Sequence, residues 1–161
     1  MEIKKLFLGL AFSSAVLFAG NFNDGMKALD SGNISKAIEQ FQTLAKSGDV
    51  DSQTMLGEMY LDGIGTNQDT KKAYYWIQKA ANAGDKEAEY LLGFMYENGI
   101  EVKQDISEAV AWYQKAANKG DTMAMYNLAF IYKNGANGVN KDMNKAVSLL
   151  QKVEEIKSRD M

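Results

Sequence analysis

The sequence predicts an all-α protein, an α/α solenoid of about four antiparallel helical hairpins. Three segments align with one another at a 36-residue period, and each holds two apolar stretches with helical spacing. A fixed period of about 20 to 50 residues is typical of repeat architectures. Apolar side chains at positions i and i+4 share one face of a helix. With no proline in the chain, glycine and asparagine separate the two stretches, so each copy is expected to be a helical hairpin.

The first residues have the pattern of a secretory signal peptide. Two lysines precede an apolar run from Leu6 to Phe18, and the small residue Ala19 follows this run. A charged start, a short apolar centre and a small-residue exit are typical of such signals, whereas a membrane span needs about 20 apolar residues. We therefore predict a signal peptide over residues 1–19 and a periplasmic or secreted mature chain without a membrane span. An uncleaved N-terminal anchor is the alternative.

A degenerate repeat is predicted over residues 20–49. Ala37 aligns with Ala73 of the next copy, and Gly48 aligns with Gly84, but the hairpin loop is shorter. Solenoid ends expose apolar surface unless they are capped. A homodimer through this N-terminal repeat is therefore a further hypothesis, and it would use four apolar side chains: Phe22, Met26, Leu29 and Ile34.

Three full repeats are predicted over residues 50–85, 86–121 and 122–161. The first helix of each repeat holds a leucine, a small residue, a tyrosine and a closing glycine at constant spacing. These are Leu56, Gly57, Tyr60 and Gly63, then Leu92, Gly93, Tyr96 and Gly99, then Leu128, Ala129, Tyr132 and Gly135. The small residue is expected to face an alanine of the second helix, Ala73, Ala109 or Ala146, because close backbones leave no room for larger side chains. The charged helix from Lys141 suits a C-terminal cap.

The recurring strings resemble Sel1-like repeats of the tetratricopeptide superfamily, in a bacterial exported form without cysteines. They are LGEMYLDGIG from Leu56, LGFMYENGI from Leu92, and KAA before an AG or KG turn, with Trp76 and Trp112 in the second helices. The resemblance covers residues 51–156, and the unit before it looks like a plain tetratricopeptide repeat. It implies a solenoid whose first helices line a concave groove. By analogy with other proteins of this fold, it also implies an interaction scaffold or adaptor more often than an enzyme.

The groove positions give the candidate partner-binding residues. In tetratricopeptide-like hairpins, positions three before and one after the small residue point into the groove, and the last two repeats hold aromatic residues there. Large apolar side chains exposed together mark a binding surface. With their flanking positions, the predicted site is Tyr90, Phe94, Tyr126, Phe130, Glu58, Glu87 and Met123.

Two alternatives place these aromatic side chains elsewhere. They could pack on one another across the hairpin boundary, or lie under the tail from Val153 to Met161. The groove positions hold no lysine, arginine or asparagine, so a basic clamp for a C-terminal carboxylate is not expected. A hydrophobic or aromatic-bearing peptide segment is the expected ligand.

Composition argues against catalysis, cofactors and nucleic acid. The chain has no histidine and no cysteine, which removes the commonest general base, the thiol nucleophiles and the usual zinc ligands. We expect no catalytic residues, no metal and no cofactor. Lysine and arginine number 18 against 21 acidic residues, so a phosphate backbone is not an expected partner.

The enzyme alternative is a β-lactamase-type hydrolase, because cysteine-rich secreted relatives have been described in that way. That chemistry places a lysine three residues after the nucleophilic serine, and no serine of this chain has that neighbour. Where those relatives join adjacent units by disulfides, this chain has Ala81 near Glu89 and Ala117 near Met125. A structural homo-oligomer is the remaining alternative.

Overall fold

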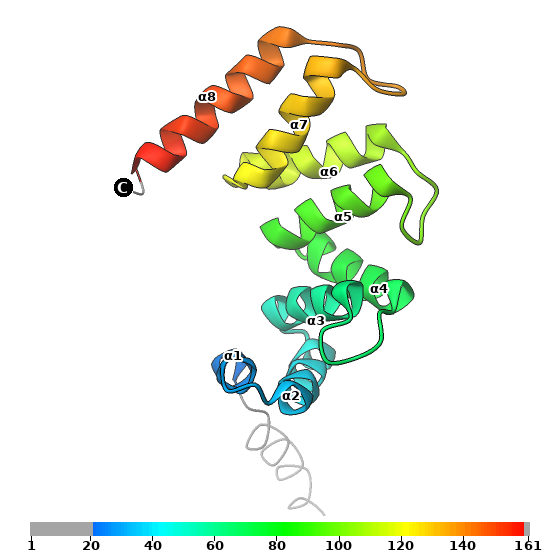
Figure 1. Ribbon diagram of the computed structural model, residues 1–161, viewed down its shortest axis with the longest axis vertical. Coiled ribbons are helices and arrows are strands. Elements are labelled where there is room, and N and C mark those ends of the chain that lie inside the picture. Colours follow the sequence, from blue (N-terminus) through cyan, green and yellow to red (C-terminus); the bar gives the residue numbers. More distant parts are fainter. Residues whose placement is uncertain (1–20, 160–161) are drawn as a thin grey trace, which may run out of the picture.

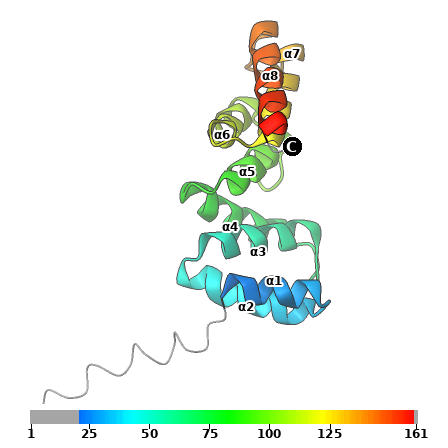
Figure 2. The same ribbon diagram turned by 90° about the vertical axis from the view of Figure 1, so that its left-hand side faces the viewer.

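The computed structural model describes residues 21–159, and these form eight helices without a named strand (Figure 1). Consecutive helices pair into four hairpins, which stack from α1–α2 at one end to α7–α8 at the other (Figures 1 and 2). The helices are α1 (Phe22–Asp30), α2 (Ile34–Ser47), α3 (Val50–Asp62), α4 (Thr70–Asn82), α5 (Lys86–Asn98), α6 (Ile106–Asn118), α7 (Thr122–Asn134) and α8 (Met143–Arg159). The predicted all-α solenoid is confirmed. The predicted signal peptide lies outside the described residues.

An aspartate begins each helix from α3 to α8. Its side chain accepts a hydrogen bond from the backbone N–H three residues later, which satisfies one of the free donors at a helix start. The capping residues are Asp49, Asp69, Asp85, Asp105, Asp121 and Asp142. Helices α3 and α5 end at Gly63 and Gly99, whose φ angles of 72° and 68° favour glycine. The repeated aspartates and glycines therefore set the length of each hairpin.

The small residues of the first helices allow close approach of a large side chain. A Cβ on Gly57 would lie 2.5 Å from Cγ1 of Ile77, and a Cβ on Gly93 would lie 2.7 Å from Cδ1 of Tyr113. The expectation that Gly57 meets Ala73 was therefore incomplete. The side chain that fills this space belongs to Ile77, one helical turn further along α4.

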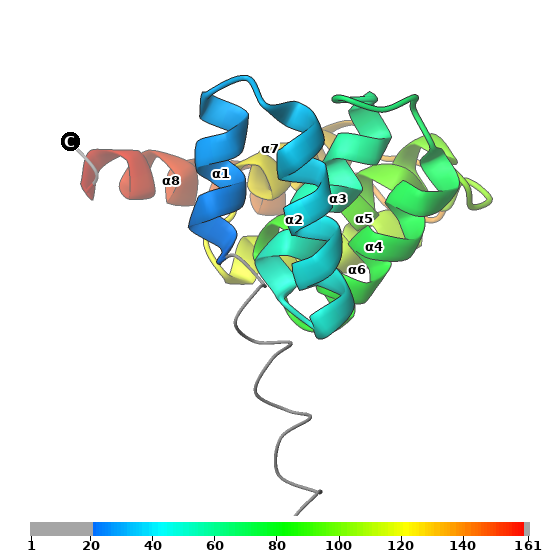
Figure 3. The ribbon, with the colours of Figure 1, turned by 90° about the horizontal axis from the view of Figure 1, so that it is seen from below.

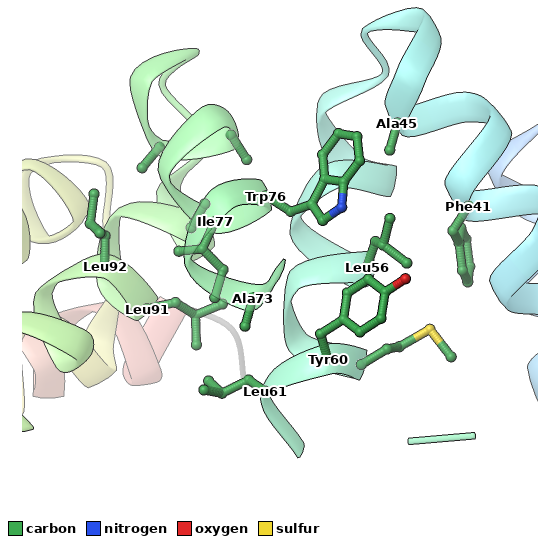
Figure 4. Close-up of a cluster of buried hydrophobic side chains, with 14 of the residues drawn as sticks. Phe41, Ala45, Leu56, Tyr60, Leu61, Ala73, Trp76, Ile77, Leu91 and Leu92 are labelled. Carbon is green, nitrogen blue, oxygen red and sulfur yellow. The ribbon is translucent and has the colours of Figure 1, made fainter. Parts of the chain in front are cut away.

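The core runs through the stack between successive hairpins. Figure 4 shows side chains from α2, α3, α4 and α5 that meet in its first half, where Phe41, Leu56 and Ile77 are almost fully buried. Of the recurring leucine, tyrosine and tryptophan residues, Leu56, Tyr60, Trp76, Leu92 and Leu128 are buried. The other three, Tyr96, Trp112 and Tyr132, are half-buried and pack against the core from its edge.

Polar contacts join neighbouring hairpins. Thr54 on α3 donates a 2.8 Å hydrogen bond to Asp85, the residue that caps α5. Lys119, which follows α6, donates a 2.8 Å hydrogen bond to the carbonyl of Gly84 at the end of the preceding hairpin. Within its own hairpin Lys119 also donates a 2.6 Å hydrogen bond to Glu89 on α5, which is 3 % exposed. The chain has no cysteine, so hydrogen bonds of this kind, and not disulfides, link neighbouring hairpins.

Candidate functional site

The seven predicted binding residues all lie on the first helices α3, α5 and α7. We call them the first-helix face: Glu58, Glu87, Tyr90, Phe94, Met123, Tyr126 and Phe130. Tyr90 and Tyr126 are 36 residues apart, as are Glu58, Phe94 and Phe130. Equivalent positions of stacked repeats lie side by side, because each repeat packs on its neighbour in the same way. Glu87 and Met123 are also 36 residues apart, so the face crosses three helices in three rows.

The apolar side chains of this face differ in exposure. Phe130 is 66 % exposed and Met123 is 54 % exposed. Tyr90, Phe94 and Tyr126 are partly buried and pack against the second half of the core. Within this face, the apolar side chains that remain open to solvent lie on α7.

The first alternative, packing of these rings on one another across the boundary between hairpins, does not describe the contact of Tyr90, which lies inside its own hairpin. Its ring lies 5.7 Å from the ring of Tyr113 on α6, so it packs across the boundary between two helices of one hairpin. Burial raises the pKa of Tyr90, and the charge of Asp121 raises it further. Tyr90 is therefore only partly exposed on the face, and it also packs against the core.

The other alternative holds in part for Tyr126. Lys157 near the end of α8 donates a 2.7 Å hydrogen bond to the Tyr126 hydroxyl, and its ammonium lies 5.3 Å from the centre of the ring. This bond raises the pKa of Lys157. Helix α8 projects past the other helices at its C-terminal end, as seen along the stack from the α1–α2 end in Figure 3. The tail covers part of Tyr126 and leaves Phe130 open.

A hydrogen-bonded group beneath the face was missed by sequence reasoning. Tyr113 is fully buried, and its hydroxyl donates a 2.6 Å hydrogen bond to Glu97 on α5. Burial, followed by this bond, raises the Tyr113 pKa, and Asn127 beside the hydroxyl opposes the rise. Asn127 could have been noticed, because it is a polar residue at the position that Met55 and Leu91 occupy in the earlier copies.

The α3–α5 end of the face is acidic. Glu58 is half-buried, and burial raises its pKa to about 7, with the charges of Glu87, Asp62 and Asp85 adding to the effect. Six ion pairs occur within residues 21–159, and none of them involves these four carboxylates. Thr54 is 4 % exposed and bonded to Asp85, so it belongs to the contact between repeats.

A second apolar patch lies on α8. Met143, Val147 and Leu150 are 48 %, 46 % and 42 % exposed. The predicted cap is thus only partly polar, although its charged side chains are exposed as expected. At the other end, the apolar residues proposed for a homodimer pack against the core and are half-buried: Phe22, Met26, Leu29 and Ile34.

Within residues 21–159, no three acidic, histidine or cysteine side chains gather in an arrangement that could hold a metal ion. None of the helices in this part of the chain is long and apolar enough to cross a membrane.

Comparison with known proteins identifies the repeat. The family model of the Sel1 repeat matches residues 50–85, 86–121 and 122–152. No curated protein sequence matches the chain.

Three solved structures resemble the chain. A protective antigen of uropathogenic Escherichia coli with an SLR fold is 30 % identical with a TM-score of 0.78, over 84 % of this chain and 31 % of that one. A Sel1 repeat protein from Oxalobacter formigenes is 32 % identical with a TM-score of 0.76, over 83 % and 56 %. Cysteine-rich protein B of Helicobacter pylori is 26 % identical with a TM-score of 0.57, over 88 % and 94 %. The chain therefore spans less than two thirds of the first two proteins.

Proposed function

Because the chain belongs to the Sel1 repeat family, whose fold indicates a protein–protein interaction scaffold, we propose that it is exported and binds a peptide segment of a partner on its first-helix face. The family accounts for the interaction role. The proposed export and binding surface rest on residues of this chain itself.

The observation that carries the binding surface is the exposure of Phe130 and Met123 beside three partly buried aromatic rings. Large apolar side chains cost free energy when they remain in water, and contiguous ones mark interaction surfaces. Aromatic anchors also supply much of the binding free energy in protein interfaces. A peptide laid across α5 and α7 would cover Phe94 and Phe130 together.

The experiment compares a double variant with a matched control. Phe94→Ala with Phe130→Ala removes two rings from the face, whereas Tyr75→Ala removes one ring that is 57 % exposed on α4. Both variants should retain the circular dichroism spectrum of the helical fold. Affinity capture from the exported fraction should then lose a partner with the double variant and retain it with the control. Equal recovery of the partner with both variants would remove the proposal.

Export rests on the sequence of residues 1–19. Cell fractionation together with the mass of the purified chain tests it, since cleavage after Ala19 leaves a chain that begins at Gly20. Retention of residues 1–19 in a cytoplasmic protein would count against export. Retention in a membrane fraction would favour the uncleaved anchor.

We also propose that the chain has no catalytic residues. It resembles a cysteine-rich protein of Helicobacter pylori, yet it has no cysteine, no histidine and no serine followed three residues later by lysine. Incubation of purified chain with a chromogenic β-lactam should give no turnover above the buffer rate. Turnover that saturates with substrate would establish the hydrolase alternative.

A structural homo-oligomer is a second candidate, favoured by the open patch of Met143, Val147 and Leu150 on α8. The N-terminal repeat has less free apolar surface, because its candidate residues pack on the core. Sedimentation at several concentrations tests both interfaces. A monomer throughout removes the candidate, and an oligomer that persists in Leu150→Glu points to the N-terminal repeat.

A further inference from the structure

The first-helix face is divided by charge along the stack. At α3 and α5, burial raises the pKa of Glu58, and the charges of Glu87, Asp62 and Asp85 raise it further. At α7, Phe130 and Met123 are exposed, and Lys133 follows Phe130 by one helical turn. Lys157 of α8 is bonded to Tyr126 on α7, but it is paired with Glu154 at 3.8 Å, so the positive charge of this end comes mainly from Lys133, which is in none of the ion pairs of residues 21–159. The apolar surface therefore has an acidic end and a basic end.

We propose that the peptide bound on this face carries a lysine or arginine, placed against Glu58 and Glu87, next to apolar or aromatic side chains placed on Phe94 and Phe130. The inference rests on the proposed function, since it names the chemistry of the peptide that the same face would take.

The carboxylates of the acidic end have no ion-pair partner within residues 21–159. These carboxylates are those of Glu58, Glu87, Asp62 and Asp85. Glu58 is half-buried, so its charge is less screened by water than that of a fully exposed carboxylate. A guanidinium or ammonium group placed there reduces the repulsion among the four carboxylates and gains charge-assisted hydrogen bonds. A carboxylate of the peptide in the same place would add to that repulsion.

The charges of the face also favour one orientation of the peptide. A peptide laid in the opposite direction would bring its basic residue toward Lys133, where like charges repel. The apolar contacts on Phe94 and Phe130 hold the peptide, and the two charged ends then select one direction and one charge pattern. Arginine should be preferred over lysine, because its planar group can bond two carboxylate oxygens at once.

The test is selection of a random 12-residue peptide display library on the folded chain. Selected peptides should be enriched in arginine or lysine within a few positions of an aromatic or aliphatic residue. Synthetic copies should bind the double variant Glu58→Gln with Glu87→Gln at least tenfold more weakly than the unchanged chain. The matched control neutralises two exposed carboxylates on second helices, Glu39→Gln with Glu108→Gln, and should bind as the unchanged chain does.

The outcomes separate this inference from the proposed function. If the selected peptides depend on Phe94 and Phe130 but lack basic residues, or lose no affinity in the Glu58→Gln, Glu87→Gln variant, the inference is overturned and the binding surface stands. If peptide binding is unchanged in Phe94→Ala with Phe130→Ala, the first-helix face is not the site and both fail. Binding that depends on both pairs supports both.

Discussion

Gly93 on α5 lies directly against the ring of Tyr113 on α6. A Cβ on Gly93 would lie 2.7 Å from Cδ1 of the Tyr113 ring and 3.2 Å from the carbonyl oxygen of Ala109. Tyr113 in turn bonds Glu97 and packs on Tyr90, so this contact positions part of the first-helix face. The absence of a side chain at Gly93 is therefore linked to the geometry of the candidate site.

Gly93→Ala is expected to destabilise the fold by about 1–2 kcal/mol. Alanine gains helix propensity of about 1 kcal/mol, but forcing a methyl group into a filled space costs about 1–3 kcal/mol and requires the Tyr113 ring to move. Urea unfolding followed by circular dichroism measures the change. In a Tyr113→Leu background the same substitution should cost less than in the native background. An equal cost in both backgrounds would show that the ring is not the obstacle.

Ile77 and Leu150 occupy equivalent positions in the second helices of two repeats, and they are expected to differ in their contribution to stability. Ile77 is fully buried between hairpins, whereas Leu150 is 42 % exposed on α8. Ile77→Ala removes buried apolar surface and leaves a cavity, at a cost of about 2–5 kcal/mol, while Leu150→Ala should cost less than about 1 kcal/mol. Thermal or urea unfolding of both variants measures the difference. Equal costs would mean that Leu150 is covered in solution, as in an oligomer.

Glu58→Gln is expected to stabilise the fold at pH 8 but not at pH 4. Burial and neighbouring carboxylates raise the Glu58 pKa from 4.5 to about 7 in the folded chain. The folded state therefore binds the proton more tightly than the unfolded state, and the free energy of unfolding decreases as pH rises from about 4.5 to about 7. Because Glu58 is partly exposed, the gain at pH 8 should be roughly 1 kcal/mol, and it should disappear at pH 4. Glu39→Gln on α2 is the control. A gain of the same size at both values of pH would contradict this cause.

Binding of a basic peptide should weaken as pH falls below the Glu58 pKa of about 7. Protonation of Glu58 removes one of the charges that face the ligand, while Glu87 and Asp85 on α5 and Asp62 on α3 remain around it. Isothermal titration of a selected peptide at pH 8 and pH 6 should show a loss of severalfold in affinity. The loss should be absent in Glu58→Gln. If that variant retains the same pH dependence, another group is responsible.

The architecture could be read from the sequence because its signals are local and repeated. Leu56, Leu92 and Leu128 at a constant period identify the buried side of the first helices, and all three are buried. Glycines such as Gly63 and Gly99 mark helix ends through a backbone conformation that other residues rarely adopt. A short stretch of chain is sufficient to produce each of these features, so the fold class followed without coordinates.

The exposure and the charge environment of each site residue were decided by tertiary structure. Phe94 and Phe130 occupy equivalent positions, yet Phe94 is partly buried and Phe130 is 66 % exposed. Glu58 acquires its raised pKa partly from Glu87 and Asp85 on the next hairpin, and Tyr126 is covered by Lys157, which lies 31 positions later. A periodic pattern identifies which side of a helix faces the core. It does not specify which side chains from other helices cover a given residue, because those contacts depend on how neighbouring hairpins and the final helix pack.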